Sequence, residues 1–148
     1  MLPRAVFLMM NPSTATETKN DPTVTRCQER ANHWLLSGWL NVGGVEVVNV
    51  FAWRETNSKL LAVRIAEGVD IIGPDNDIAI VQACKGAAIV VCAWGKEGHF
   101  LLNRGPKVLS LLRTHGVKPN VFKVNADGSP KHPLYESYKT MPHPWDGA

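Results

Sequence analysis

Four apolar runs, separated by stretches with helical spacing, constrain the fold of this chain more than any other feature. The runs are residues 4–10 (RAVFLMM), 45–51 (VEVVNVF), 88–94 (AIVVCAW) and 117–124 (VKPNVFKV). The first three are almost continuously apolar, which is typical of strands covered on both faces. Pro119 in the fourth run lacks an amide donor, so this run is expected to form an edge strand or to begin after the proline.

Helical patterns lie between these runs. Asp21-Pro22 reads as a helix start, and an apolar stripe follows it as far as Ser37-Gly38. Further helices are expected over residues 58–66, from Pro74 to Gly86, and over residues 107–115. The tail after Val124 is rich in Pro, Gly and His and is expected to be irregular. Strands that alternate with helices predict an α/β fold with a parallel sheet, right-handed crossovers and helices on both faces.

Composition narrows the class of protein. A chain of 148 residues, 45% apolar and 20% charged, suits one folded domain spanning residues 1–148. There is no signal-peptide pattern and no apolar run long enough to span a membrane, so a cytoplasmic protein is expected. Three separate cysteines and five histidines without ligand spacing argue against a metal site, and no cofactor is predicted. A net charge of +3 is compatible with a polyanionic partner but does not require one.

Polar residues follow the ends of the predicted strands. They lie in residues 11–15 after the first run, 53–56 after the second, 94–96 after the third and 125–135 after the fourth. Ligands of parallel α/β sheets bind beyond the carboxyl ends of the strands. If the topology is as predicted, these four segments share one rim and form one site.

Each polar segment has two interpretations. Asn49 lies among valines, where an unpaired amide costs about 1–3 kcal/mol, so it is either a bonded core amide or a reader of a nucleobase edge. Asn11-Pro12, with Ser13 and Thr14, is either a turn or a loop whose amides approach an anion. His132 is either an exposed loop residue or a functional one.

Three further residues carry the same ambiguity. Trp94 and Phe51 suit a core, although Phe51 also stands where a stacking platform is needed. Arg26 is either a solvated charge or, because it lies near the rim, a phosphate ligand.

Several short motifs together resemble a known family. They are Asn11-Pro12-Ser13-Thr14-Ala15, Asp21-Pro22-Thr23, Arg26-Cys27, Val48-Asn49-Val50-Phe51-Ala52, Asn76-Asp77, Ala93-Trp94-Gly95 and His132-Pro133-Leu134-Tyr135. Together they span nearly the whole chain. The chain resembles the bacterial and phage family catalogued as domain of unknown function 1643, which brings no established activity.

The order of segments is also similar, more distantly, to the uracil-DNA glycosylase superfamily. That resemblance implies a three-layer α/β/α sandwich around a four-stranded parallel sheet of order 2-1-3-4. It implies that Asn11 positions a water, that Asn49 pairs with a base and that His132 stabilises charge on the base oxygen. It also implies that Phe51 stacks on a flipped base. The full set of expected site residues is catalytic Asn11 and His132, ligand-binding Pro12, Ser13, Thr14, Asn49, Phe51, Arg54, Trp94, Leu134 and Tyr135, and phosphate-binding Arg26.

The chain departs from the glycosylase pattern at three points. Asn11 replaces the aspartate of the fastest branch, which implies slow hydrolysis. Ser13 replaces a bulky ring, which implies room for a 5-substituted pyrimidine. The usual serine does not follow Pro133.

Three functions follow as hypotheses. The first is an enzyme that hydrolyses a pyrimidine N-glycosidic bond in DNA or in a nucleotide, where donors aimed at the leaving base supply several kcal/mol. The second is a non-catalytic binder of nucleic acid or free nucleotide, in phage DNA modification or defence. The third is a nucleotide-processing transferase with phosphate held at Ser13 and Thr14.

Overall fold

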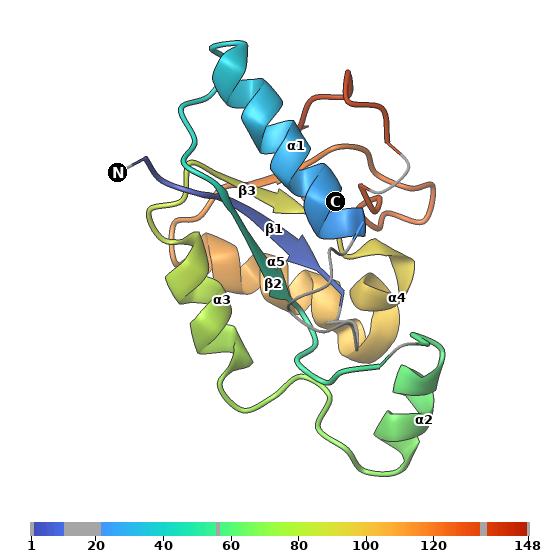
Figure 1. The fold of residues 1–148 in the computed structure, drawn as a ribbon. Helices are drawn as coiled ribbons and strands as arrows, with labels where there is room; N and C mark the ends of the chain where they lie inside the picture. The colour runs from blue at the N-terminus through green and yellow to red at the C-terminus, as the bar shows by residue number, and fades with distance from the viewer. Residues whose placement is uncertain (1, 11–21, 56, 134–135, 148) are drawn as a thin grey trace.

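A computed structural model describes residues 2–10, 22–55, 57–133 and 136–147 of the chain (Figure 1). In this part of the chain, one sheet has the strand order β2-β1-β3-β4-β5. The strands are β1 (Ala5–Met9), β2 (Val45–Asn49), β3 (Ile89–Cys92), β4 (Pro119–Val121) and β5 (His143–Pro144). The first four are mutually parallel, and β5 is antiparallel to β4.

The sheet differs from the predicted one by its fifth strand. The four-stranded, wholly parallel sheet expected from the sequence is therefore wrong in that detail. β5 pairs His143 with Val121 and Pro144 with Asn120. Two residues are too few to show the alternation that marks a strand in sequence, and Pro144 is tolerated because β5 lies at the edge. The sheet thus ends in a short, proline-bearing strand.

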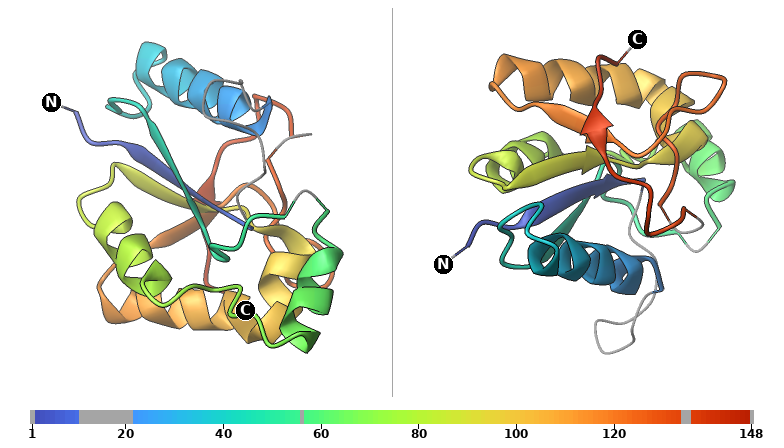
Figure 2. Two further views of the ribbon diagram at one scale, coloured as in Figure 1. Left: turned by 60° about the horizontal axis from the view of Figure 1, so that its bottom comes forward. Right: turned by 90° about the horizontal axis from the view of Figure 1, so that it is seen from above.

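Helices cover both faces of the sheet (Figure 2). They are α1 (Pro22–Leu36), α2 (Leu60–Ala66), α3 (Asn76–Cys84), α4 (Gly95–Phe100), a 3₁₀ turn (Leu101–Asn103) and α5 (Arg104–Thr114). α1 lies on one face and α3 and α5 lie on the other. The mixed α/β class predicted from the alternating pattern is confirmed.

The core follows from this arrangement. β1 is fully buried because it pairs on both sides and is covered on both faces. Alternate residues enter two apolar clusters: Phe7 packs with Trp34 and Phe122 beneath α1, whereas Leu8 packs with Ile80 and Leu112 beneath α3 and α5.

One helix was not expected. No helix was expected directly after the third apolar run, but Trp94 immediately precedes the six-residue helix α4. Two glycines hide this helix in the sequence, because glycine is a poor helix former. Gly98 is required by packing: a Cβ atom there would lie 2.9 Å from Trp94 Cβ and 3.3 Å from Met10 Cγ. α4 therefore lies directly against the end of β1.

The described residues contain neither a membrane-spanning helix nor a cluster of metal ligands. None of the helices combines the length and hydropathy that a membrane span requires. Nor does any group of three His, Cys, Asp or Glu side chains in the described ranges lie close enough together to hold a metal ion.

Candidate functional site at the carboxyl ends of the strands

The carboxyl ends of the four parallel strands meet at one edge of the sheet. Backbone pairing continues beyond the strands: the amides of Val50 and Phe51 donate to the carbonyls of Met9 and Met10, each at 2.9 Å. The structure thus brings the residues that follow β2 beside Met10, the last described residue before the predicted Asn-Pro segment.

Six of the predicted site residues lie outside the described residues. They are Asn11, Pro12, Ser13, Thr14, Leu134 and Tyr135. Their predicted roles stay predictions.

Asn49 is the last residue of β2 and pairs with Met9. By the alternation of a strand, its side chain shares the α1 face with those of Val45 and Val47, which pack against the cluster beneath α1. The residue is half-buried, and within the described ranges no residue hydrogen-bonds to its carboxamide. Its polar side chain therefore lies at the strand end with its donor and acceptor unpaired by any described residue.

The backbone at this point is held by two side chains from the opposite face. Asn76 Nδ2 donates to the carbonyl oxygens of Asn49 at 2.8 Å and Val50 at 3.1 Å. Arg104 Nε donates to Val50 at 2.9 Å, and Arg104 Nη2 forms an ion pair with Asp77 Oδ1 at 2.6 Å. These contacts fix the end of β2. Sequence reasoning missed Arg104, which lies before the helix predicted over residues 107–115 and is the first residue of α5 in the structure.

Phe51 and Trp94 occupy the core. Both rings are fully buried in the cluster beneath α3 and α5. Trp94 Nε1 donates to His99 Nδ1 at 3.2 Å, and its ring stacks on the imidazole. In this structure Phe51 therefore has no open face on which a base could stack, which corrects that expectation. Arg54, by contrast, is exposed on the segment after β2.

His99 is a buried histidine that the sequence did not distinguish from the other four. Burial lowers its pKa, while the charge of Asp127 acts in the opposite direction. α5 packs so closely that a Cβ atom on Gly105 would lie 2.0 Å from His99 Nδ1. Since Nδ1 accepts from Trp94, the imidazole is a neutral core group and not an open site residue.

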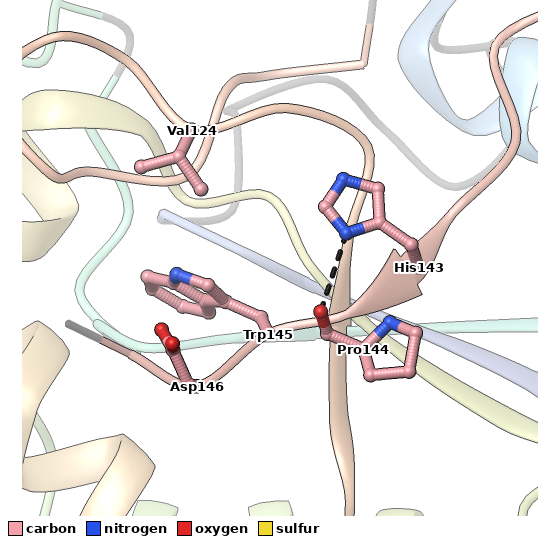
Figure 3. A pocket seen from close by; sticks show the side chains of 5 residues that line it. All are labelled: Val124, His143, Pro144, Trp145 and Asp146. Carbon is pink, nitrogen blue, oxygen red and sulfur yellow. Dashed lines mark hydrogen bonds between the residues drawn. The ribbon is translucent and has the colours of Figure 1, made fainter.

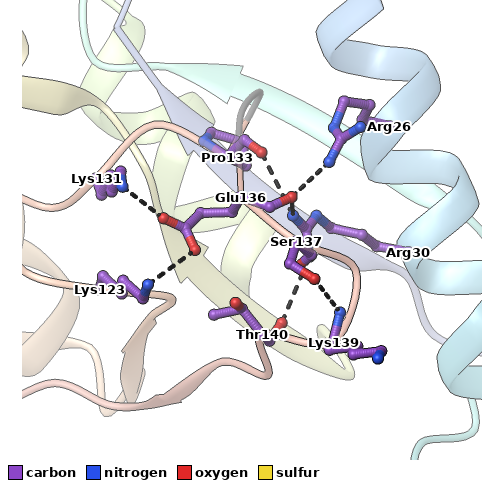
Figure 4. Close-up of polar contacts among 9 residues, drawn as sticks. All are labelled: Arg26, Arg30, Lys123, Lys131, Pro133, Glu136, Ser137, Lys139 and Thr140. Carbon is purple, nitrogen blue, oxygen red and sulfur yellow. Dashed lines mark hydrogen bonds and ion pairs between the residues drawn. The ribbon is translucent and has the colours of Figure 1, made fainter.

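On the α1 face, two arginines hold the segment that follows the predicted His-Pro motif (Figure 4). Arg30, which is 1% exposed, donates to four backbone carbonyls of residues 133–140. Its distances are 3.4 Å to Pro133, 2.6 Å to Glu136, 3.1 Å to Ser137 and 3.4 Å to Thr140. The guanidinium also lies over the rings of Phe122 and Tyr138. Arg30 thus holds the backbone of this segment at four described residues.

Arg26 lies one helical turn earlier, where the sequence predicted a phosphate ligand. It donates to the carbonyl of Glu136 and stacks on Tyr138, with 4.3 Å between its guanidinium carbon and the ring centroid. The Nε atoms of Arg26 and Arg30 are buried and find no hydrogen-bond partner among the described residues. Arg26 therefore contributes to the fold through a backbone carbonyl and a ring, and the ion pairs among the described residues do not include it.

Glu136 is the buried carboxylate of this cluster. Lys131 Nζ lies 2.7 Å from one of its oxygens and Lys123 Nζ lies 3.5 Å from the other. The Lys131 hydrogen bond, above all, lowers the pKa of Glu136 against the opposing effect of burial. His132 is exposed, between Lys131 and Pro133. We call Arg26, Arg30, Lys123, Lys131 and Glu136 the basic cluster.

A separate hollow of about 500 Å³ lies beside β5 (Figure 3). It is lined by Val124, His143, Pro144, Trp145 and Asp146. None of these was a predicted site residue, and the hollow does not include Asn49 or the basic cluster.

Comparison with known proteins assigns the chain to a family. The family model described as "Protein of unknown function (DUF1643)" matches residues 1–134. The chain belongs to this family. The matched part of this DUF1643 protein contains Asn49, Arg104 and both α1 arginines, whereas Glu136 lies beyond it. No curated protein and no solved structure matches the chain.

Proposed function

We propose that this DUF1643 protein binds a nucleobase or nucleotide at the carboxyl end of its sheet. The observation that carries the proposal is the carboxamide of Asn49, half-buried at the end of β2 and without a hydrogen-bond partner among the described residues. A primary amide offers a donor and an acceptor side by side, which matches the edge of a base.

The rigidity of the strand end supports this role. Asn76 and Arg104 bind the carbonyls of Asn49 and Val50, so the backbone that carries the carboxamide is fixed before any ligand arrives. A pre-organised polar group loses less entropy on binding than a mobile one.

The topology also supports it. Ligands of parallel α/β sheets bind beyond the strand ends, where the strand order reverses. Here β1 lies between β2 and β3, so the reversal falls at β1, directly beside Asn49. We further propose that the four parallel strands, with α1 on one face and α3 and α5 on the other, form a uracil-DNA glycosylase-like sandwich extended by β5.

Calorimetry tests the binding proposal. Titration with pyrimidine and purine nucleosides and nucleotides is expected to show binding that Asn49→Ala weakens about tenfold or more, because the base loses two hydrogen bonds. Asn49→Asp keeps the shape but removes the donor, and should change which base is preferred. Asn41→Ala, an exposed asparagine before β2, is the control. Unchanged binding by the Asn49→Ala variant would exclude Asn49 as the residue that recognises the base.

Hydrolysis of a pyrimidine N-glycosidic bond is the second candidate. Its specific support is His132, exposed at the start of a segment that Arg30 holds through the carbonyl of Pro133. A donor held in place can stabilise negative charge on a departing base, and Asn11 would position the attacking water.

An abasic-site assay decides between enzyme and binder. The substrates are oligonucleotides with uracil, a thymine mismatch or 5-hydroxymethyluracil, with free nucleosides in parallel. An enzyme should lose roughly 100- to 1,000-fold in rate on His132→Ala. Binding without cleavage of any substrate would leave the protein a non-catalytic binder, for which phage DNA modification or defence is the proposed setting.

A further inference from the structure

We infer that the basic cluster binds a phosphate group, so that the ligand of this protein is a phosphorylated nucleotide or a nucleic-acid strand and not a free base. The inference rests on the proposed function for the base, but its own evidence is the charge around Glu136.

The cations of the basic cluster outnumber the carboxylates that they contact. Four cations of the cluster meet at Glu136, yet only the two lysines contact its carboxylate. Arg26 and Arg30 donate instead to backbone carbonyls, which accept hydrogen bonds but carry no formal charge. The nearby Glu29 accepts the hydroxyl of Tyr138. Positive charge is therefore in clear excess where the segment packs on α1.

This excess of positive charge is partly shielded from water. Arg30 is buried beside Arg26, and both Nε atoms are buried without partners among the described residues. Burial first, and the charge of Arg26 second, lower the pKa of Arg30. Like charges in a partly buried site repel, because water screens them poorly. An anion at the edge of the cluster would relieve this repulsion.

Two cations of the basic cluster are accessible to a ligand. The side chains of Lys123 and Lys131 are 58% and 43% exposed. A backbone hydrogen bond of 2.9 Å from Lys131 to Lys123 joins the two positions, and both ammonium groups reach Glu136 from the side opposite α1 (Figure 4). Lys123 is only loosely paired, at 3.5 Å, so it is the cation best able to turn to a phosphate oxygen.

The position of the cluster fits a ligand that also reaches Asn49. Lys131 adjoins His132, and Arg26 lies in the first half of α1, on the same face of the sheet as the Asn49 side chain. Phosphate and base of one ligand would thus be held by two parts of the same rim.

The test compares ligands that differ only in phosphate. Thymidine, thymidine 5′-monophosphate and a short single-stranded oligothymidylate are titrated by calorimetry, and inorganic phosphate is added in a thermal-shift assay at constant ionic strength. The wild-type protein should bind the monophosphate about tenfold more tightly than the nucleoside, since a charge-assisted hydrogen bond is added. Inorganic phosphate should raise Tm more than chloride does.

Lys123→Gln removes the loosely paired cation and leaves Lys131 on Glu136. It should abolish the preference for the monophosphate and the phosphate-induced rise in Tm. Lys118→Gln, an exposed lysine before β4, should change neither. Equal affinity of the wild type for nucleoside and monophosphate, or equal behaviour of the two variants, would overturn the inference.

The source of the phosphate and the base-reading proposal are tested separately. If the phosphate belongs to a strand, oligothymidylate should bind more tightly than the monophosphate, and the slope of log K against log salt should decrease in magnitude by about 0.7 in Lys123→Gln. If it belongs to a free nucleotide, the strand should gain nothing. A phosphate response that persists while Asn49→Ala changes no affinity would sink the base reader but leave the phosphate site standing.

Discussion

The two buried arginines of this protein, one on each face of the sheet, are stabilised in different ways. Arg104 and Arg30 are 2% and 1% exposed, and both donate to backbone carbonyls. Arg104 also forms an ion pair with Asp77, whose side chain is 53% exposed. Arg30 has no carboxylate within the described hydrogen bonds and ion pairs; its partners are four carbonyls and two aromatic rings.

The charge of Arg104 is compensated by a carboxylate, whereas the described contacts of Arg30 leave its charge uncompensated. On the Arg104 side, a cation and an anion cancel, and the contact fixes the end of β2. On the Arg30 side, neutral oxygens satisfy donors without cancelling charge, so the surrounding surface stays positive. Hydrogen bonding and charge compensation are thus distinct requirements, and of these two arginines only Arg104 has a carboxylate partner among the described contacts.

Removing each guanidinium is the strongest test of this comparison. Arg30→Met should lower the free energy of unfolding by about 3 kcal/mol, because hydrogen bonds from a charged donor contribute about 1.5–3 kcal/mol each and add incompletely. Arg104→Met should cost less, about 1–2 kcal/mol, since Asn76 still binds Val50 and water solvates Asp77. Urea unfolding measures both. Faster proteolysis within residues 133–140 is expected only for Arg30→Met.

Substitution by lysine, which keeps the charge but not the guanidinium geometry, should lower the free energy of unfolding by a smaller amount. Lysine has three donors on one atom and cannot reach four carbonyls spread over residues 133–140. Arg30→Lys should therefore cost about 2 kcal/mol and Arg104→Lys about 1 kcal/mol. If Arg30→Lys were as stable as the wild type, charge alone would hold the segment and its four carbonyl bonds would be incidental.

The pH dependence of stability should separate the two faces. Because the pKa of His99 is lowered in the fold, its contribution is complete above about pH 6.5 and is lost as pH falls from there through the folded pKa. The lowered pKa of Glu136 contributes above about pH 4.5 and is lost below it. The pKa of Asp127 is also lowered, so its carboxylate likewise contributes stability that is lost at acidic pH.

Thermal unfolding from about pH 2 to about pH 8 measures these windows. His99→Gln, which retains an acceptor for Trp94, should remove the loss of stability that begins as pH falls below about 6.5. Glu136→Gln should flatten the acidic end. A curve unchanged in both variants would mean that other groups control acid stability.

The smallest effect is expected from Asp77→Asn, which makes Arg104 resemble Arg30. Since the carboxylate is half-exposed, the lost ion pair should cost less than about 1 kcal/mol. A loss of several kcal/mol would show that the fold tolerates an uncompensated buried arginine only on the α1 face.

Local patterns in the sequence predicted the alternating elements well. β1 and β3 come from continuous apolar runs, and α1 begins at the proline after Asp21. What failed were α4, which contains two glycines that lower helix propensity, and β5, which is two residues long. Both exist because of tertiary contacts: Gly98 packs on Trp94, and β5 adds to the edge of β4.

The site was predicted less completely. Asn49 stood out because an amide among valines breaks the apolar pattern. Arg30 and Glu136 did not, because a buried charge looks like a surface charge until the partners distant in sequence are known. The same holds for Phe51, whose position after a strand was equally compatible with a core ring and with a stacking platform.

The contacts of Arg30 also bear on how the chain is made. Its acceptors lie 103 to 110 residues later in the chain. As the ribosome releases the protein from the N-terminus onward, α1 emerges with a guanidinium whose final partners do not yet exist. The helix can form early, but its docking must wait until the acceptor residues have left the ribosome, and closing so long a loop carries an entropic cost. The nascent protein should therefore be sensitive to proteases at its first helix until those residues have emerged.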